Sequence, residues 1–201
     1  HRGACYMIDG KMGSGKTLII NLLSKQISKY DGKIFYDGKE LKKISNKNYN
    51  KDISIVTQST KQPYFGNVKS YVMKEILSKN NDNTHKRKFE SIVKVMDIKH
   101  LLNNKLRGLS PSQFRWVDLA SKIGSYPKIL FIDEIELHLS RSDLDSLSKI
   151  LYRKCNYDGV SIIATTQNKE MLYNLISVNI TINQGRINKV RSFHSKSKKN
   201  K

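Results

Sequence analysis

The chain has 201 residues, which suits one α/β domain with a sizeable core. Its hydrophobic content of 38% is too high for a disordered chain, and its apolar runs are too short to cross a membrane. The formal net charge of +20 favours a lysine-rich solvated surface, with a functional basic patch for anionic lipid or nucleic acid as the alternative.

The first third of the chain alternates between predicted strands and helices. The apolar run at residues 4–9 ends at a glycine and predicts a buried strand. The spacing of apolar residues over 16–28 predicts a helix that packs on a sheet. Residues 33–36 and 53–56 predict two further strands, and Asp37-Gly38 indicates a turn after the first of them.

The middle of the chain has a helical pattern. Helices are predicted over residues 68–77, 87–96 and 112–123, with a polar linker at 80–84 between the first two. Strand patterns then return at the end of the chain. The closing elements are strands over 128–133 and 160–165, a helix over 142–152, and a hairpin of strands 178–183 and 186–190.

This order predicts an α/β fold in which a parallel sheet carries an inserted helical subdomain. We expect one domain over residues 1–191, with the helical subdomain over about 67–123 and a basic, disordered tail over 192–201. Because the sequence begins with His1 rather than Met, we expect this domain to be truncated at its N-terminus.

Residues 10–17 read GKMGSGKT and match the phosphate-loop pattern G-x-x-x-x-G-K-[ST]. Glycines let the backbone curl so that successive N–H groups point at phosphate oxygens, and the helix that follows favours anions at its N-terminus. Lys16 is expected to reach the β- and γ-phosphates during catalysis, and Thr17 to offer its hydroxyl to Mg²⁺. We therefore expect ATP or GTP to bind the loop through Gly10, Lys11, Met12, Gly13, Ser14, Gly15, Lys16 and Thr17.

Residues 129–134 read ILFIDE, an apolar strand that ends in two carboxylates. This is the Walker B pattern of phosphate-loop enzymes. Asp133 is expected to hold Mg²⁺, directly or through water, and Glu134 to polarise the attacking water as a general base.

In their order and spacing, the motifs resemble those of the ATP-binding cassette (ABC) ATPases over nearly the whole chain. The matching segments are residues 3–17, 32–38 (GKIFYDG), 53–58 (ISIVTQ, the Q-loop), 64–68 (YFGNV), 109–113 (LSPSQ, where the family signature LSGGQ belongs) and 182–187 (INQGRI). The resemblance implies that Gln58 binds magnesium and senses the γ-phosphate. It also implies that Ser110 and Gln113 contact nucleotide held by a second cassette.

The resemblance implies a transport function. Two cassettes, identical or different, pair head to tail around ATP and Mg²⁺, and a transmembrane domain converts their association into transport. The expected location is the cytoplasmic face of the cell membrane, and nucleic acid is not an expected partner. An exporter is preferred over an importer because YFGNV at 64–68 is similar to a stretch found in exporter cassettes.

Three positions depart from the family pattern. Pro111 and Ser112 replace the signature glycines. This predicts either weaker contacts to the nucleotide bound by the second cassette or a variant that functions normally. Gln167 stands where the family has a histidine that follows a threonine, and glutamine cannot become cationic. Residues 137–140 (LHLS) replace a loop of small residues. We expect Gln167 to serve catalysis poorly, so that hydrolysis is slow or the cassette belongs to an asymmetric pair.

Two other classes of function remain as alternatives. Residues 133–140 (DEIELHLS) are faintly similar to soluble ABC-type ATPases that act on DNA or ribosomes, although the short interval between Lys16 and Ser110 leaves no room for their long coiled coils. The departures above also fit a regulatory cassette that binds ATP without hydrolysing it.

Overall fold

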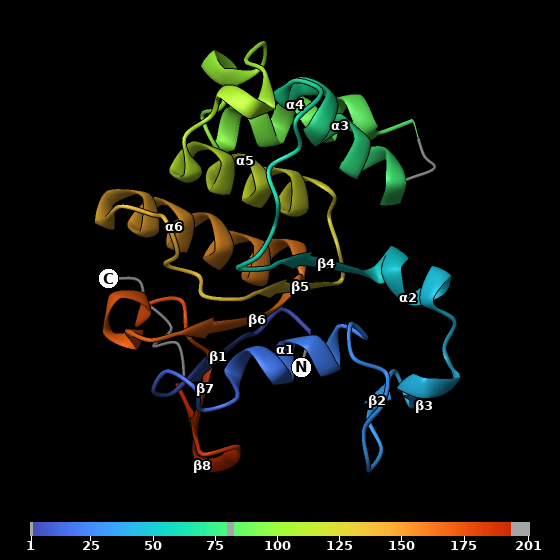
Figure 1. The fold of residues 1–201 in the computed structure, drawn as a ribbon, viewed down its shortest axis with the longest axis vertical. Helices are drawn as coiled ribbons and strands as arrows, with labels where there is room; N and C mark the ends of the chain where they lie inside the picture. Colours follow the sequence, from blue (N-terminus) through green and yellow to red (C-terminus); the bar gives the residue numbers. More distant parts are fainter. Residues whose placement is uncertain (1, 80–82, 194–201) are drawn as a thin grey trace, which may run out of the picture.

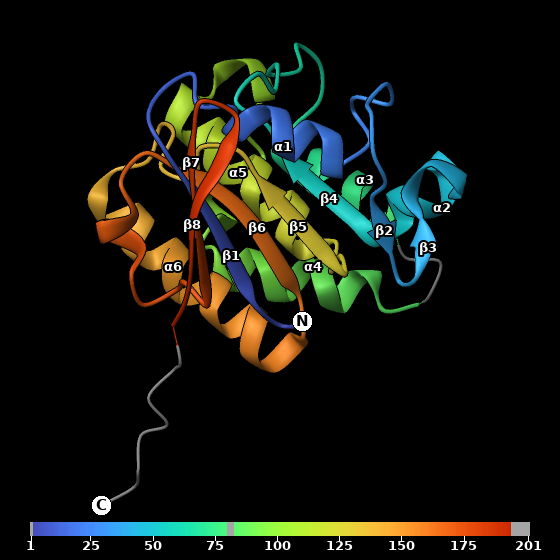
Figure 2. The same cartoon turned by 90° about the horizontal axis from the view of Figure 1, so that it is seen from below.

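The computed structural model describes residues 2–79 and 83–193. Within them, strands form a main sheet in the order β4-β5-β6-β1-β7-β8, side by side in Figure 2. Neighbours from β4 to β7 run parallel, and β8 pairs antiparallel with β7. The strands are β1 (Cys5–Asp9), β4 (Ile53–Val56), β5 (Ile129–Ile132), β6 (Ser161–Thr166), β7 (Val178–Asn183) and β8 (Arg186–Ser192).

Helices cover both faces of this sheet, as a parallel sheet with apolar strands requires. On one face α1 (Lys16–Leu23) buries Ile20 against Phe131 of β5. On the other face lie α6 (Arg141–Asp158) and the helical layer (Figure 1). The alternation along β5 explains the two-sided core, because Leu130 and Ile132 belong to the cluster opposite Phe131.

The helical layer consists of α3 (Val68–Lys79), α4 (His85–Val95) and α5 (Pro111–Gly124). Helix α5 lies between the sheet and the other two helices (Figure 1). Gly124 permits this close packing, because a Cβ atom there would lie 2.9 Å from Cγ2 of Ile92 in α4.

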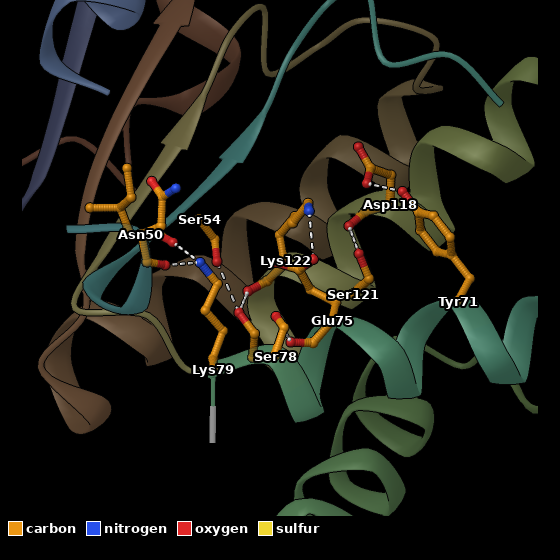
Figure 3. A network of polar contacts seen from close by, with 11 residues as sticks. Asn50, Ser54, Tyr71, Glu75, Ser78, Lys79, Asp118, Ser121 and Lys122 are labelled. Atoms are coloured by element: carbon orange, nitrogen blue, oxygen red, sulfur yellow. Dashed lines mark hydrogen bonds and ion pairs between the residues drawn. The ribbon is translucent and has the colours of Figure 1, made fainter. Parts of the chain in front are cut away.

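A row of polar contacts joins α3 to α5 and to the sheet (Figure 3). The Tyr71 hydroxyl donates to Asp118 at 2.8 Å, and Lys122 pairs with Glu75 at 2.9 Å. At the end of α3, the Lys79 ammonium donates to the carbonyls of Asn50 and Ile53, next to β4. We call Tyr71, Glu75, Lys79, Asp118 and Lys122 the polar seam. It fixes the rotation of α3 against α5, because each polar contact needs one particular register.

Short elements fill the region between α1 and β4. They are the hairpin of β2 (Phe35–Tyr36) and β3 (Lys39–Glu40), the 3₁₀ helix Leu41–Lys43 and the helix α2 (Asn46–Asp52). Further 3₁₀ helices occur later in the chain, at Lys99–Leu101, Leu106–Gly108 and Lys169–Leu172. The sequence did not predict α2, because NKNYNKD has no apolar period. It forms because Ser45 caps it and because Tyr49 is buried, with its hydroxyl donating to Leu23 at 2.7 Å.

The predicted α/β fold is confirmed, with several boundaries moved. The helix predicted over 16–28 ends at Leu23, because Lys25 adopts a left-handed φ of 60°. Helix α6 runs further than predicted, to Asp158, where Gly159 ends it with a φ of 68°. Most of the predicted linker 80–84 and of the tail 192–201 lies outside the described residues, although Ser192 itself belongs to β8. Each helix within the described residues is too short or too polar to cross a bilayer.

The position of α5 inside the fold predicts a large stability loss for Leu119→Ala. Leu119 has no exposed surface, so truncation removes buried methyl groups and leaves a cavity. We expect the free energy of unfolding, measured by urea titration, to fall by about 2–5 kcal/mol. Leu77→Ala is the matched control, since Leu77 on α3 is 46% exposed. Equal losses in the two variants would contradict the buried placement of α5.

Candidate functional site

The parallel strands bring the predicted site residues to one edge of the sheet. The loop 10–17 follows β1, Gln58 lies just beyond β4, Asp133 follows β5, and Gln167 follows β6. Carboxyl ends of neighbouring parallel strands meet at the same edge, which is where α/β proteins bind their ligands. Side chains from distant parts of the sequence therefore gather there.

The phosphate loop (residues 10–17) curls tightly between β1 and α1. Gly13 and Gly15 have left-handed φ angles of 74° and 101°, which only glycine adopts without strain. The Lys16 ammonium donates to the carbonyls of Gly10 and Lys11 at 2.7 and 2.9 Å, and Lys16 is 6% exposed. The loop thus carries a buried cation where α1 begins, a combination that favours phosphate.

The hairpin of β7 and β8 packs against the backbone of this loop. The backbone N–H of Gly185, at the hairpin turn, donates to the Ser14 carbonyl at 3.0 Å. A Cβ atom at Gly10 would lie 2.4 Å from the Ile182 carbonyl oxygen, so glycine is the only residue that fits. Sequence reasoning missed this contact, since no local pattern connects position 10 with position 182.

Two residues that we predicted to bind Mg²⁺ lie in contact. The Gln58 amide donates to the Thr17 hydroxyl at 3.3 Å. The third, Asp133, is 2% exposed, and its Oδ1 accepts a hydrogen bond from Thr165 at 2.6 Å. A hydroxyl, an amide oxygen and one carboxylate fit Mg²⁺, which proteins hold through one or two carboxylates together with substrate phosphates.

The predicted base lies against the residue at the predicted switch position. Oε1 of Glu134 accepts a hydrogen bond from the Gln167 side-chain amide at 2.9 Å, and the backbone N–H of Gln167 donates to Glu136 at 2.6 Å. Thr165 fixes the backbone here, because its Oγ1 accepts from the Glu134 N–H at 2.7 Å while donating to Asp133. Thr165 was missed, although a threonine that ends an apolar strand was a usable signal.

The signature segment (residues 109–113) forms the start of α5. Ser110 and Gln113 make a reciprocal capping box, in which Ser110 Oγ accepts from the Gln113 N–H at 3.2 Å and Gln113 Oε1 accepts from the Ser110 N–H at 3.0 Å. Pro111 occupies the first helical position, where proline is favourable. Within the described part of the chain, Ser110 and Gln113 make no hydrogen bond to the phosphate loop.

An unexpected charged group lies directly before the phosphate loop. Asp9, 9% exposed, accepts hydrogen bonds from Lys169 (2.7 Å), Thr181 (2.7 Å) and Asn179 (2.8 Å). Burial by itself would raise the pKa of Asp9, but these hydrogen bonds and the Lys169 charge outweigh it, so the pKa is lowered. The ion pair joins the end of β1 to the segment that follows Gln167. The sequence pattern alone indicated nothing at either residue.

Comparisons with known proteins show which family the sequence matches. A model of the ABC transporter family matches residues 1–136. A putative ABC transporter ATP-binding protein of Clostridium tetani is 27% identical over 170 residues, which cover 85% of this chain and 38% of that protein. The methionine import ATP-binding protein MetN 1 of Staphylococcus epidermidis is 26% identical over 171 residues, or 81% of this chain and 49% of that protein. This chain thus spans less than half the length of either relative.

Solved structures show the same fold. The dimeric structure of MJ0796, a bacterial ABC transporter cassette, superposes with a TM-score of 0.87 at 17% identity and covers 97% of this chain and 88% of that one. The structure of cbiO1 from Clostridium perfringens, part of the transporter complex cbiONQ, gives a TM-score of 0.82 at 21% identity over 95% of this chain and 78% of that one. At such identities the likeness concerns the fold alone.

The ion pair at Asp9 predicts a pH-dependent contribution to stability. Because the folded pKa is below the unfolded value of about 3.9, the contribution is complete above that value and is lost as the pH falls through the folded pKa. At pH 7 we expect Asp9→Asn to lower the free energy of unfolding by about 1–2 kcal/mol. At lower pH this difference between the variant and the native chain should become smaller. Urea titrations between pH 3 and 7 measure this difference.

A surface ion pair provides the control. Asp158, whose side chain is 39% exposed, pairs with Lys154. We expect Asp158→Asn to lower the free energy of unfolding by about 0.5 kcal/mol or less. A difference between Asp9→Asn and the native chain that stays constant down to pH 3 would contradict a lowered Asp9 pKa.

Proposed function

This chain belongs to the ABC transporter family, and from that membership we propose that it is an ATP-binding cassette that hydrolyses ATP to power transport across a membrane. The observation that carries this proposal is the gathering of Thr17 with Gln58 and of Glu134 with Gln167 beside the phosphate loop. The proposed domain covers residues 1–191, with the helical subdomain at about 67–123 and a basic tail after the domain.

The proposed chemistry uses residues of this chain in separate roles. Loop N–H groups and the Lys16 ammonium bind the β- and γ-phosphates. Thr17, Gln58 and Asp133 would hold Mg²⁺, which neutralises charge on the phosphates when bound. Glu134 takes a proton from the attacking water. The buried Thr165 bond keeps Asp133 oriented, and the backbone bond from Glu134 to Thr165 aims the base.

We propose that the working unit contains two cassettes and a transmembrane domain, at the cytoplasmic face of the cell membrane. The signature segment supports this, because Ser110 and Gln113 lie exposed at the N-terminus of α5 and make no hydrogen bond to this chain's own loop among the described residues. A helix N-terminus that carries a free face favours the γ-phosphate of nucleotide in a second cassette. At the first helical position a backbone N–H has no partner within the helix, so Pro111 does not weaken α5. This supports the interpretation that the helix tolerates the altered signature.

The direction of transport has two candidates. The segment 64–68 (YFGNV) supports an exporter, whereas two of the curated relatives, the MetN and MglA proteins, carry import in their names and support an importer. ATP-driven uptake of candidate solutes into inside-out vesicles that contain the complete transporter identifies an exporter, and ATP-driven release identifies an importer.

Substitutions at Lys16 and Glu134 test the proposed ATPase. We expect Lys16→Ala to weaken binding of a fluorescent ATP analogue by about tenfold or more, because one buried ammonium contact is lost. Glu134→Gln keeps binding but lowers phosphate release by about 100-fold or more, since the base is gone. Lys149→Ala, at an exposed position of α6, is the control. Chelation of Mg²⁺ by EDTA is expected to stop turnover. Unchanged binding and turnover in both variants would exclude this site.

Gln167→His tests whether the native residue makes hydrolysis slow. Gln167 donates to Glu134 but stays neutral, whereas a histidine adds a group that can carry positive charge at the γ-phosphate. We expect turnover of the full-length protein to rise by about tenfold. If turnover stays the same while Glu134→Gln abolishes it, the slow-site proposal is wrong. If Gln167→His and native protein both bind ATP without any hydrolysis, the regulatory cassette becomes the better description.

A further inference from the structure

The side chain of Arg115 lies at the junction of three parts of the site. It belongs to α5, one turn after the capping box of Ser110 and Gln113, and is 4% exposed. Its guanidinium donates to the Thr57 carbonyl at 2.8 Å, to the Asp133 carbonyl at 2.8 Å and to the Glu134 carbonyl at 2.9 Å. All three bonds are in the normal range and go to backbone oxygens.

These carbonyls belong to two loops. The loops carry predicted magnesium ligands and the predicted general base. Thr57 and Gln58 follow β4, while Asp133 and Glu134 follow β5. One planar group therefore ties both strand ends to the helix that begins with the signature segment. A guanidinium has its donors in a fixed fork, so a displacement of either loop must displace α5 or break a buried bond.

Nearby carboxylates offset part of the cost of burying the Arg115 charge. Desolvation lowers the pKa of Arg115, while the carboxylates of Asp118, Asp133, Glu134 and Glu136 act in the opposite direction. Among the described residues, Nε of Arg115 and Oδ2 of Asp118 have no hydrogen-bond partner, and both residues line a cavity of about 220 Å³ beside Gln58. Buried polar groups without hydrogen-bond partners lower the free energy of unfolding. A contact with only a structural role would be expected to avoid this loss.

A second contact extends the connection into the helical layer. Asp118 lies nearly one turn after Arg115 on α5 and accepts the hydrogen bond from Tyr71 of α3, as Figure 3 shows for the polar seam. Motion of α5 along its axis would therefore be shared with α3 rather than absorbed between the two helices.

We propose that Arg115 is a positioning residue that couples nucleotide occupancy at this chain's own phosphate loop to the placement of the signature segment that it presents to a second cassette. The inference rests on the proposed ATP binding. If Gln58 moved toward bound Mg²⁺ and Glu134 toward the attacking water, their backbones would move with them, and the three carbonyl bonds would carry that movement to α5.

The chain contains a natural reporter for this coupling. Trp116 is the only tryptophan in the sequence and follows Arg115 directly. Its indole N–H donates to the Met96 carbonyl at 2.8 Å, at the end of α4, and its side chain is partly buried. A movement of α5 against α4 changes this environment, so Trp116 emission reports the position of α5 without requiring hydrolysis.

The test is a titration of the full chain with Mg-ATP, followed by Trp116 emission, in native protein and in Arg115→Met, Arg115→Lys and Arg153→Met. Arg153 lies exposed on α6 and controls for loss of an arginine. Binding is measured separately with a fluorescent ATP analogue, and folding by thermal denaturation. We expect native protein and Arg153→Met to show the same emission change. Arg115→Met should bind the analogue within about threefold of native affinity, yet reduce the emission change by about fivefold or more.

Arg115→Lys separates charge from geometry. Lysine keeps the positive charge and supports folding but lacks the fork, so the emission change should stay below about half of the native one. Arg115→Met or Arg115→Lys that folds, binds the analogue and keeps the native emission change would overturn the proposal. So would native protein that binds nucleotide without any change in emission. Failure of native protein to bind the analogue is a separate result, because it refutes the proposed ATP binding itself.

Discussion

The parallel alignment of β4, β5, β6 and β1 is the constraint on which the site depends. Each strand ends at the same edge, and each is followed by a residue with a chemical role in the proposed reaction. The cost of this arrangement is that both faces of the sheet must be covered, by α1 on one side and by α5 and α6 on the other. Helix α5, which begins within the signature segment, is therefore also a core helix, so a change in its position involves the sheet.

Local signals account for what the sequence predicted correctly. The strand at Ile53–Val56 and the phosphate loop are short patterns in which neighbouring residues carry the information. The α/β fold followed from the order of such patterns. Helix α2 was missed because its stability comes from Tyr49, which packs against elements distant in sequence. The end of α1 was placed too late because an apolar period continued past the left-handed Lys25.

Short motifs in the sequence predict the individual site residues but not the contacts between them. Gln58, Asp133, Glu134 and Gln167 were each recognisable from a motif. The contacts of Asp133 and Glu134 with Thr165 depend on strand register, which no motif encodes. The same holds for Arg115, whose three acceptors are backbone carbonyls and therefore leave no residue pattern at the other end. Buried polar groups on α5, such as Arg115 and Asp118, therefore have partners that lie far away in the sequence.

The support of the phosphate loop by the β7–β8 hairpin has a consequence for how the protein matures. The loop and β1 are made before their partners, because among the described residues both sheet neighbours of β1, β6 and β7, come later in the chain. Gly10 reaches its final environment only when the Ile182 carbonyl arrives, and Ser14 only when Gly185 does. A segment made early is thus completed by one made later, and a nascent chain that stalls before the hairpin leaves its phosphate loop without this support.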